Sequence, residues 1–153
     1  RARQTAECIG MSLGLTPMLV TEFRERRYGS FEGLTYADAR SSYPDEYAAF
    51  EQRDPVRPLP GGGESLRDFH SRVTARLQQL AQAHAGETIV VVTHGGVLDI
   101  VNRFVRGNPL DIPRDFQIPN AGVNWLELRG DQWSLISWGE TDHLHAAALD
   151  ELP

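Results

Sequence analysis

The sequence predicts an α/β domain in which a mostly parallel sheet carries helices on both faces. Residues 88–93 form a continuous β-branched and apolar run, without the polar alternation of a half-exposed strand, which is typical of a central parallel strand. The run ends at a His-Gly-Gly turn, residues 94–96, and apolar residues then recur at helical spacing over residues 97–105. A buried strand, a tight glycine turn and an amphipathic helix in direct succession form the unit from which α/β folds are built.

The N-terminal part of the sequence predicts a helix, a short strand and a charged loop. Apolar residues at helical spacing indicate a helix over residues 2–13, and Gly14 supplies the left-handed residue with which helices commonly end. Residues 17–20 indicate a short extended strand. Residues 21–29 are too charged for a core strand and too irregular for a helix, so we expect a loop at the end of that strand, where functional residues concentrate.

Two short helices are expected next. Thr35 is suited to cap a helix over residues 36–41, and Pro44 is suited to start another that reaches about Glu51. Residues 53–63 contain three prolines and three consecutive glycines, so they cannot continue that helix.

The most regular pattern in the chain is that of an amphipathic helix. Apolar residues step by three and four between Ser65 and Gly86, and a serine at this position is a common helix cap. Two shorter patterns, residues 123–128 and 133–138, are strand-like and are separated by a turn that contains Gly130. They predict a hairpin near the C-terminus.

The basic residues of the chain are all arginines. They number 15 against 21 acidic residues, which gives a net charge of −6 and disfavours general affinity for nucleic acids. A chain without lysine has neither the Gly-Lys-Ser/Thr phosphate loop of nucleotide triphosphatases nor a lysine for a Schiff base. Any site for an anion must therefore use arginine, histidine or backbone N–H groups.

No segment of the sequence has the length of a membrane helix, because the longest run of large apolar residues, 89–92, falls far short of the ~20 residues required. No signal-peptide pattern opens the chain, and its one cysteine, Cys8, cannot form an internal disulfide. We therefore expect one globular domain over residues 1–153, located in the cytoplasm. No group of residues has the spacing of a metal site, so we expect neither a metal nor another cofactor.

Three residues are candidates for chemistry, and each has a structural alternative. His94 follows a buried strand and precedes a helix N-terminus, which favours anions, but this position also suits a hydrogen-bonded histidine in a tight turn. Glu25 stands among arginines, where it acts as a general acid if the fold shields it and otherwise belongs to a solvated ion-pair loop. Arg1 stands at a helix start, where it either reaches a phosphate or is solvated. The pattern alone leaves these alternatives open.

Four motifs occur in the order in which one known family has them. They are Arg-Ala-Arg-Gln-Thr-Ala at residues 1–6, a stretch beginning Glu-Arg-Arg-Tyr-Gly at residues 25–35, Pro-Gly-Gly-Gly-Glu-Ser at residues 60–65 and Val-Val-Thr-His-Gly-Gly at residues 91–96. Together they resemble the histidine phosphatase superfamily, whose fold is phosphoglycerate-mutase-like. The resemblance covers nearly the whole chain and weakens after about residue 140.

The resemblance implies a chemistry that spacing alone does not show. In that family a histidine within an Arg-His-Gly motif attacks phosphorus and becomes phosphohistidine, and a glutamate protonates the leaving oxygen. The match assigns the proton donor to Glu25, the second histidine of the pocket to His94 and the phosphate-binding arginine to Arg1. It also assigns substrate contacts to Arg26 and Tyr28. Positive groups around a transferring phosphoryl group, and a shielded carboxyl beside it, fit these roles physically.

The nucleophile of this family has no counterpart in the sequence. None of the five histidines follows an arginine and precedes a glycine. In the family, the strand that bears this histidine comes first in the chain and lies in the middle of the sheet, beside the strand that ends at His94. The resemblance therefore implies that the chain is the C-terminal three-quarters of a phosphatase domain, with N-terminal strands, in roughly 40 to 60 residues, missing from it.

The resemblance favours the phosphatase branch of the family over the mutases. Mutases have a longer insertion between the residues that match Glu25 and His94, with a paired arginine and a lysine, and Tyr36 stands at the position of that lysine. The expected activity is hydrolysis of a small phosphorylated metabolite through phosphohistidine, without a nucleic-acid or membrane partner. The alternatives are mutase-type phosphoryl transfer, a phosphate-binding pseudophosphatase if the natural protein lacks the N-terminal segment, and a generic α/β domain whose His94 turn binds an anion.

Overall fold

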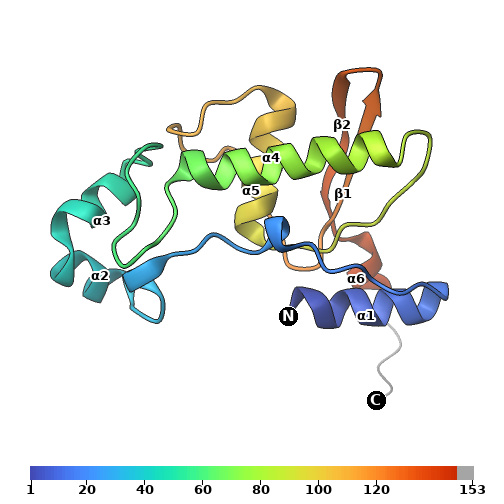
Figure 1. Cartoon of the computed structure of the whole chain (residues 1–153). Helices are drawn as coiled ribbons and strands as arrows, with labels where there is room; N and C mark the ends of the chain where they lie inside the picture. The colour runs from blue at the N-terminus through green and yellow to red at the C-terminus, as the bar shows by residue number, and fades with distance from the viewer. Residues whose placement is uncertain (148–153) are drawn as a thin grey trace, which may run out of the picture.

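The computed structural model describes residues 1–147, and most of its regular elements are helices (Figure 1). Residues 148–153, the end of the expected domain, lie outside the described residues. The α-helices are α1 (Ala2–Leu13), α2 (Tyr36–Ser42), α3 (Pro44–Glu51), α4 (Leu66–Ala83), α5 (Gly95–Arg106) and α6 (Asp142–Ala147). The remaining elements are two 3-10 turns, η1 (Thr21–Phe23) and η2 (Gly29–Phe31), and an antiparallel hairpin of β1 (Val123–Arg129) with β2 (Gln132–Glu140).

The predicted helices and the predicted hairpin are confirmed, because their signals are local in the sequence. α1 has the predicted bounds and ends at Gly14, whose φ of 67° is left-handed. Ser65 caps α4 by accepting a hydrogen bond from Asp68 N (3.0 Å), although α4 ends at Ala83, before the predicted end at Gly86. No helix among residues 1–147 combines the length and the apolar character needed to cross a membrane.

The main core lies where α4 crosses in front of α5 (Figure 1). Phe69, Val73 and Ile100 are at most 1% exposed, and burying a side chain of this size contributes ~1.5–3 kcal/mol. The buried members of this core come from η1, α4 and α5: Phe23, Phe69, Val73, Leu77, Leu80, Val97, Ile100 and Val101. The core therefore fixes η1, and the chain that follows it, on the two helices.

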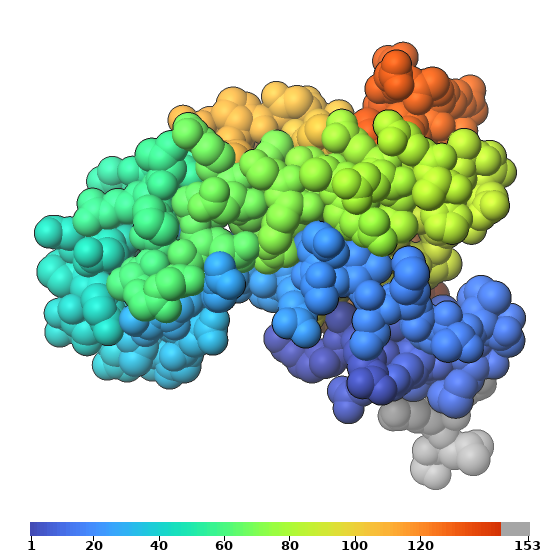
Figure 2. All heavy atoms as spheres, in the orientation of Figure 1, coloured from blue at the N-terminus to red at the C-terminus, as the bar shows by residue number. Residues whose placement is uncertain are grey.

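A second apolar cluster builds a lobe from α2, α3 and the segments beside them. Its buried members are Phe31, Ala39, Tyr47 and Leu59, and Tyr28, Tyr43 and Phe50 pack against them. Figure 2 shows a hollow in the surface between this lobe and α1. The segment that joins η1 to η2 runs along the upper edge of the hollow in this view (Figures 1 and 2). The predicted loop at residues 21–29 thus connects the main core to the lobe.

The described residues do not contain the predicted mostly parallel sheet. The sheet that the structure has in residues 1–147 is the two-stranded antiparallel pair of β1 and β2. Residues 17–20 and 88–93, whose pattern predicts strands, have no neighbouring strand in this part of the chain. Ile89, Val90 and Val91 are 39, 65 and 41% exposed. A β-branched run becomes a strand only when a neighbouring strand makes hydrogen bonds to its backbone N–H and C=O groups. None of the described segments makes such hydrogen bonds to these two runs.

Candidate active site

Glu25 lies between η1 and η2, and its carboxylate contacts the N-terminus of α5. Oε2 accepts a hydrogen bond from Gly96 N (3.0 Å), and Oε1 accepts one from Arg26 N (2.8 Å). The Gly96 N–H belongs to the first turn of α5, where backbone donors lack helical partners and the helix dipole favours negative charge. The half-buried Glu25 is therefore held by backbone N–H groups, and not by the arginine side chains beside it.

His94 is the N-cap residue of α5 and lies at the same helix end as the Glu25 carboxylate. Its backbone is extended (φ −119°, ψ 161°), and the residue is half-buried. The preceding Thr93 donates from Oγ1 to Phe23 O (2.9 Å). Two long-range hydrogen bonds therefore tie the His-Gly-Gly turn to the stretch that bears Glu25, and they bring Glu25 and His94 to one end of α5.

Gly96 permits this approach because it has no side chain. A Cβ atom on Gly96 would lie 3.0 Å from the carboxyl carbon of Glu25 and 3.3 Å from Cε1 of Phe69. The same atom on Gly95 would have open space around it. Of the two glycines in the turn, it is therefore the second that the Glu25 contact requires.

The Gly96→Ala substitution is expected to lower turnover by the full-length protein at least about tenfold, because the methyl group displaces the Glu25 carboxylate and small displacements of a reacting group are costly. Gly95→Ala is the matched control, with a much smaller expected loss. The comparison uses kcat for both variants, and thermal melts verify that each is folded. Equal activity in the two variants would show that the position of Glu25 is unimportant.

Arg26 and Tyr28, the two predicted substrate contacts, lie on either side of Arg27 and close to Glu25. Arg26 is 7% exposed, and its Nε and Nη2 donate to Glu64 O at 3.1 and 2.8 Å. Burial lowers the pKa of Arg26. Burial raises the pKa of Tyr28, and the negative charge of Glu25 raises it further. The phenol of Tyr28 is thus near the candidate acid, and two of the Arg26 donors are engaged with the protein.

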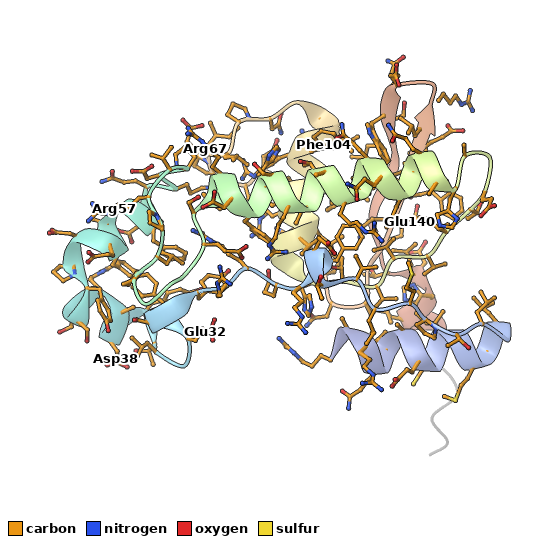
Figure 3. The ribbon with its side chains drawn as sticks, viewed as in Figure 1. Glu32, Asp38, Arg57, Arg67, Phe104 and Glu140 are labelled. Atoms are coloured by element: carbon orange, nitrogen blue, oxygen red, sulfur yellow. The ribbon has the colours of Figure 1, made fainter. Side chains whose placement is uncertain are left out.

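A pocket of about 130 Å³ adjoins Tyr28 on the side of the lobe. The ring of Tyr28 meets Phe50 edge-on, with 6.4 Å between ring centres, and its backbone N donates to Glu32 Oε1 (3.1 Å), a residue labelled in Figure 3. The pocket is lined by Tyr28, Phe31, Leu34, Thr35, Tyr36, Ala39, Tyr47 and Phe50. Periodicity does not predict it, and its signal in the sequence is the concentration of aromatic residues in 28–50.

Arg1 precedes α1 and is exposed. Its carbonyl accepts a hydrogen bond from Thr5 N (3.1 Å). Within the described residues, no hydrogen bond or ion pair joins its side chain to Glu25 or His94. The structure therefore brings Glu25 and His94 together, with Arg26 and Tyr28 nearby, whereas the phosphate contact of Arg1 stays a prediction.

A buried ion cluster around Asp99 is not predicted from the sequence. Asp99 is 5% exposed and accepts hydrogen bonds from Arg53 (2.9 Å), Arg103 (3.1 Å) and Arg114 (3.1 Å). Arg53 has a left-handed φ of 56°, which is uncommon for a residue with a side chain. The cluster fastens α5 to the chain after α3 and to the loop before β1. Its only sign in the sequence is an acid within the apolar pattern of α5, with Arg103 one turn further on.

The histidine phosphatase superfamily (branch 1) matches this chain over residues 1–141. A match of this extent shows membership, so the chain belongs to the histidine phosphatase superfamily and the resemblance of its four motifs is confirmed. Two relatives come from Arabidopsis thaliana. Phosphoglycerate mutase-like protein 4 is 38% identical over 146 residues, which cover 94% of this chain and 62% of the relative. Metal-independent phosphoserine phosphatase is 34% identical over 151 residues, which cover 97% of this chain and 61% of the relative.

The chain thus spans about three-fifths of the length of these two relatives. Solved structures show the same fold. YhfR from Bacillus stearothermophilus superposes with a TM-score of 0.81 at 27% identity, over 94% of this chain and 71% of the other. A mycobacterial glucosyl-3-phosphoglycerate phosphatase, solved with VO3, gives 0.72 at 26% identity, over 92% of this chain and 71% of the other. The described elements are therefore arranged as in the phosphoglycerate-mutase-like fold, and this part of the fold prediction is confirmed.

Proposed function

We propose that this chain is part of a phosphomonoester hydrolase that acts on a small phosphorylated metabolite through a phosphohistidine intermediate. The observation that carries the proposal is the contact of the Glu25 carboxylate with the N-terminus of α5, which His94 caps. A proton donor, an imidazole and the positive end of a helix then meet at one place. Such a place suits a phosphoryl group together with the oxygen that leaves it.

The attacking histidine is the component that no histidine of this chain matches. On the basis of the family, we assign it to an Arg-His-Gly segment of the same protein that lies outside these 153 residues. The unpaired run at residues 88–93 supports this assignment. A strand beside that run would satisfy its backbone, and in a parallel arrangement a histidine at the end of that strand would lie next to His94.

The proposed reaction has two steps. In the first, the nucleophilic histidine attacks phosphorus, the bond from phosphorus to the alcohol oxygen breaks, and protonated Glu25 gives its proton to that oxygen. In the second, water attacks phosphohistidine, Glu25 takes the proton of the water as a carboxylate, and the histidine leaves. The two N–H groups that hold Glu25 suit this ionised form.

The other candidate residues act on charge and on the remainder of the substrate. His94 and Arg1 stabilise negative charge on the phosphoryl oxygens, and Arg26 and Tyr28 contact the alcohol part. The reaction needs no metal in this scheme, because protein groups supply the positive charge. Among the described side chains, those of residues 1–144, no three histidine, cysteine, aspartate or glutamate residues are grouped to hold a metal ion. One relative is called a metal-independent phosphoserine phosphatase.

Rapid quenching of the full-length protein with a radiolabelled phosphomonoester is expected to trap the label on histidine. Phosphohistidine is identified by its loss in acid and its retention in alkali, and turnover is expected to be equal with and without a chelator. The control is the same protein with the histidine of the Arg-His-Gly segment changed to alanine, which should stay unlabelled. Label that survives acid, or turnover that a chelator abolishes, would contradict the proposal. Transfer of the label to a second metabolite would indicate a mutase.

A further inference from the structure

Arg72 on α4 uses all of its side-chain donors within the protein. Nε and Nη2 donate to the two carboxylate oxygens of Glu64, at 2.6 and 2.9 Å. Nη1 donates to the carbonyls of Glu22 (2.5 Å) and Arg24 (3.0 Å), and Nη2 also donates to that of Glu25 (3.2 Å). An arginine side chain has five N–H donors, and these five hydrogen bonds account for all of them. Arg72 therefore has no donor left for a substrate.

Glu64 holds the same stretch of chain from the other side. Its Oε2 accepts a hydrogen bond from Arg27 N (2.9 Å), and its backbone N donates to Arg27 O (2.8 Å). Its carbonyl accepts both hydrogen bonds from the Arg26 side chain. Burial acts to raise the pKa of Glu64, but the hydrogen bonds from Arg72 and Arg27 outweigh it and lower that pKa. Glu64 is therefore ionised when it makes these contacts at neutral pH.

Glu64 and Arg72 together bind each residue from Arg24 to Arg27, through its main chain or its side chain. Glu25 lies inside this stretch, and its side chain reaches from there to the N-terminus of α5. The Arg72 guanidinium also lies 4.6 Å from the ring centre of the fully buried Phe69, which anchors it on α4. The pair thus fixes the backbone that determines where the Glu25 carboxylate stands.

We propose that Arg72, held by Glu64, is a positioning residue that sets the place of the Glu25 carboxyl relative to the leaving oxygen. This inference rests on the proposed function, in which Glu25 is the proton donor. Lysine cannot make the same set of hydrogen bonds, because an ammonium group has three donors and lacks the planar, forked shape of a guanidinium group. It cannot bind both carboxylate oxygens of Glu64 and three backbone carbonyls at once.

The proposal has a kinetic signature that depends on the leaving group. An alkyl phosphate releases an alkoxide, which needs the proton of Glu25, whereas p-nitrophenyl phosphate releases a phenolate that is stable without it. A misplaced Glu25 therefore slows hydrolysis of the alkyl phosphate far more than that of the nitrophenyl ester. Simple loss of folded protein lowers both rates by the same factor.

The test compares Arg72→Lys with Arg67→Lys in the full-length protein, using glycerol 2-phosphate and p-nitrophenyl phosphate as substrates. Arg67 is exposed near the start of α4, where Figure 3 labels it, so it is a matched control on the same helix. Arg72→Lys is expected to lower kcat for glycerol 2-phosphate at least about tenfold more than for the nitrophenyl ester, with KM nearly unchanged. Arg67→Lys is expected to leave both values near those of the unmodified protein.

A double variant separates this inference from the proposed function. If Arg72 acts through Glu25, then Glu25→Gln with Arg72→Lys loses no more activity than Glu25→Gln alone. Equal losses of Arg72→Lys on the two substrates, or losses that multiply in the double variant, would overturn the positioning role. A Glu25→Gln variant without any leaving-group dependence would instead overturn the proposed function. If Arg72→Lys does not fold, Glu64→Gln replaces it, with the same signature expected and the same contrary results.

Discussion

Turnover by the full-length protein is expected to fall at least about a hundredfold in each of the variants Glu25→Gln and His94→Ala, the usual scale for a lost general acid or charge-stabilising donor. Glutamine keeps the size of Glu25 and can still accept the hydrogen bond from Gly96 N, but it cannot give a proton to the leaving oxygen. Alanine at position 94 removes the imidazole, and because the His94 side chain makes no capping hydrogen bond to α5, the helix is expected to stay in place.

Matched controls are available for both variants. Glu22→Gln changes an acid of the same loop whose carboxylate accepts a hydrogen bond from the adjacent Thr21. His84→Ala changes a histidine at the far end of α4, which lies 2.9 Å from Glu87 and takes no part in the site. Both controls are expected to keep most of the activity. The measurement is kcat and KM with an alkyl phosphomonoester such as glycerol 2-phosphate, whose leaving oxygen needs a proton. Full activity in Glu25→Gln or in His94→Ala would disprove the assigned roles.

The polypeptide of residues 1–153, made on its own, is expected to show neither a cooperative thermal melt nor turnover of p-nitrophenyl phosphate. The apolar run at residues 88–93 is exposed and unpaired in the described structure, and Met11 and Leu13 of α1 are 77 and 57% exposed. Apolar surface and unpaired backbone of this extent weaken a domain whose net stability is typically ~5–15 kcal/mol. Because no histidine of this polypeptide matches the nucleophile, the site at Glu25 and His94 is expected to bind an anion at most.

Circular dichroism during heating, together with a phosphatase assay, tests this expectation. The full-length protein, treated in the same way, is the control and is expected to melt cooperatively and to turn over substrate. A cooperative melt of the 153-residue polypeptide, accompanied by turnover, would contradict it. That result would mean that one of the five histidines present is the nucleophile.

The helices and the C-terminal hairpin could be predicted from the sequence, whereas the pairing of the run at residues 88–93 could not. Gly14 and Ser65 mark helix ends through hydrogen bonds between residues a few positions apart, so a short window contains the whole signal. The run at residues 88–93 carries an equally clear apolar pattern. A strand outside a hairpin, however, pairs with a segment far away in the chain, and no short window of sequence contains both partners.

The candidate site could be predicted only in part, because some of its signals are local in the sequence and others join distant residues. Glu25 and His94 could be selected because a family motif surrounds each of them. The hydrogen bond of Glu25 to Gly96 N, and the contacts of Arg53 and Arg114 with Asp99, join residues that are farther apart in the chain. Arg103 shows the limit most clearly, since an arginine is normally a surface residue and this one is 1% exposed. Buried, it donates to Asp99, one turn earlier on α5, and to Pro109 O (2.6 Å) beyond the end of the helix.

The contact between the Glu25 carboxylate and Gly96 N belongs to the main core, apart from the lobe that holds the aromatic pocket. The proposed proton donor, Glu25, and the helix end proposed to attract the phosphoryl group are held together on the core of α4 and α5. The lobe of α2 and α3, with its aromatic pocket, has a separate apolar cluster. Substitutions in the lobe can therefore reshape the surroundings of the alcohol part of a substrate while the distance between acid and phosphoryl site stays the same. In the proposed phosphatase, such a division would allow evolution to change the preferred phosphomonoester while the reacting groups keep their places.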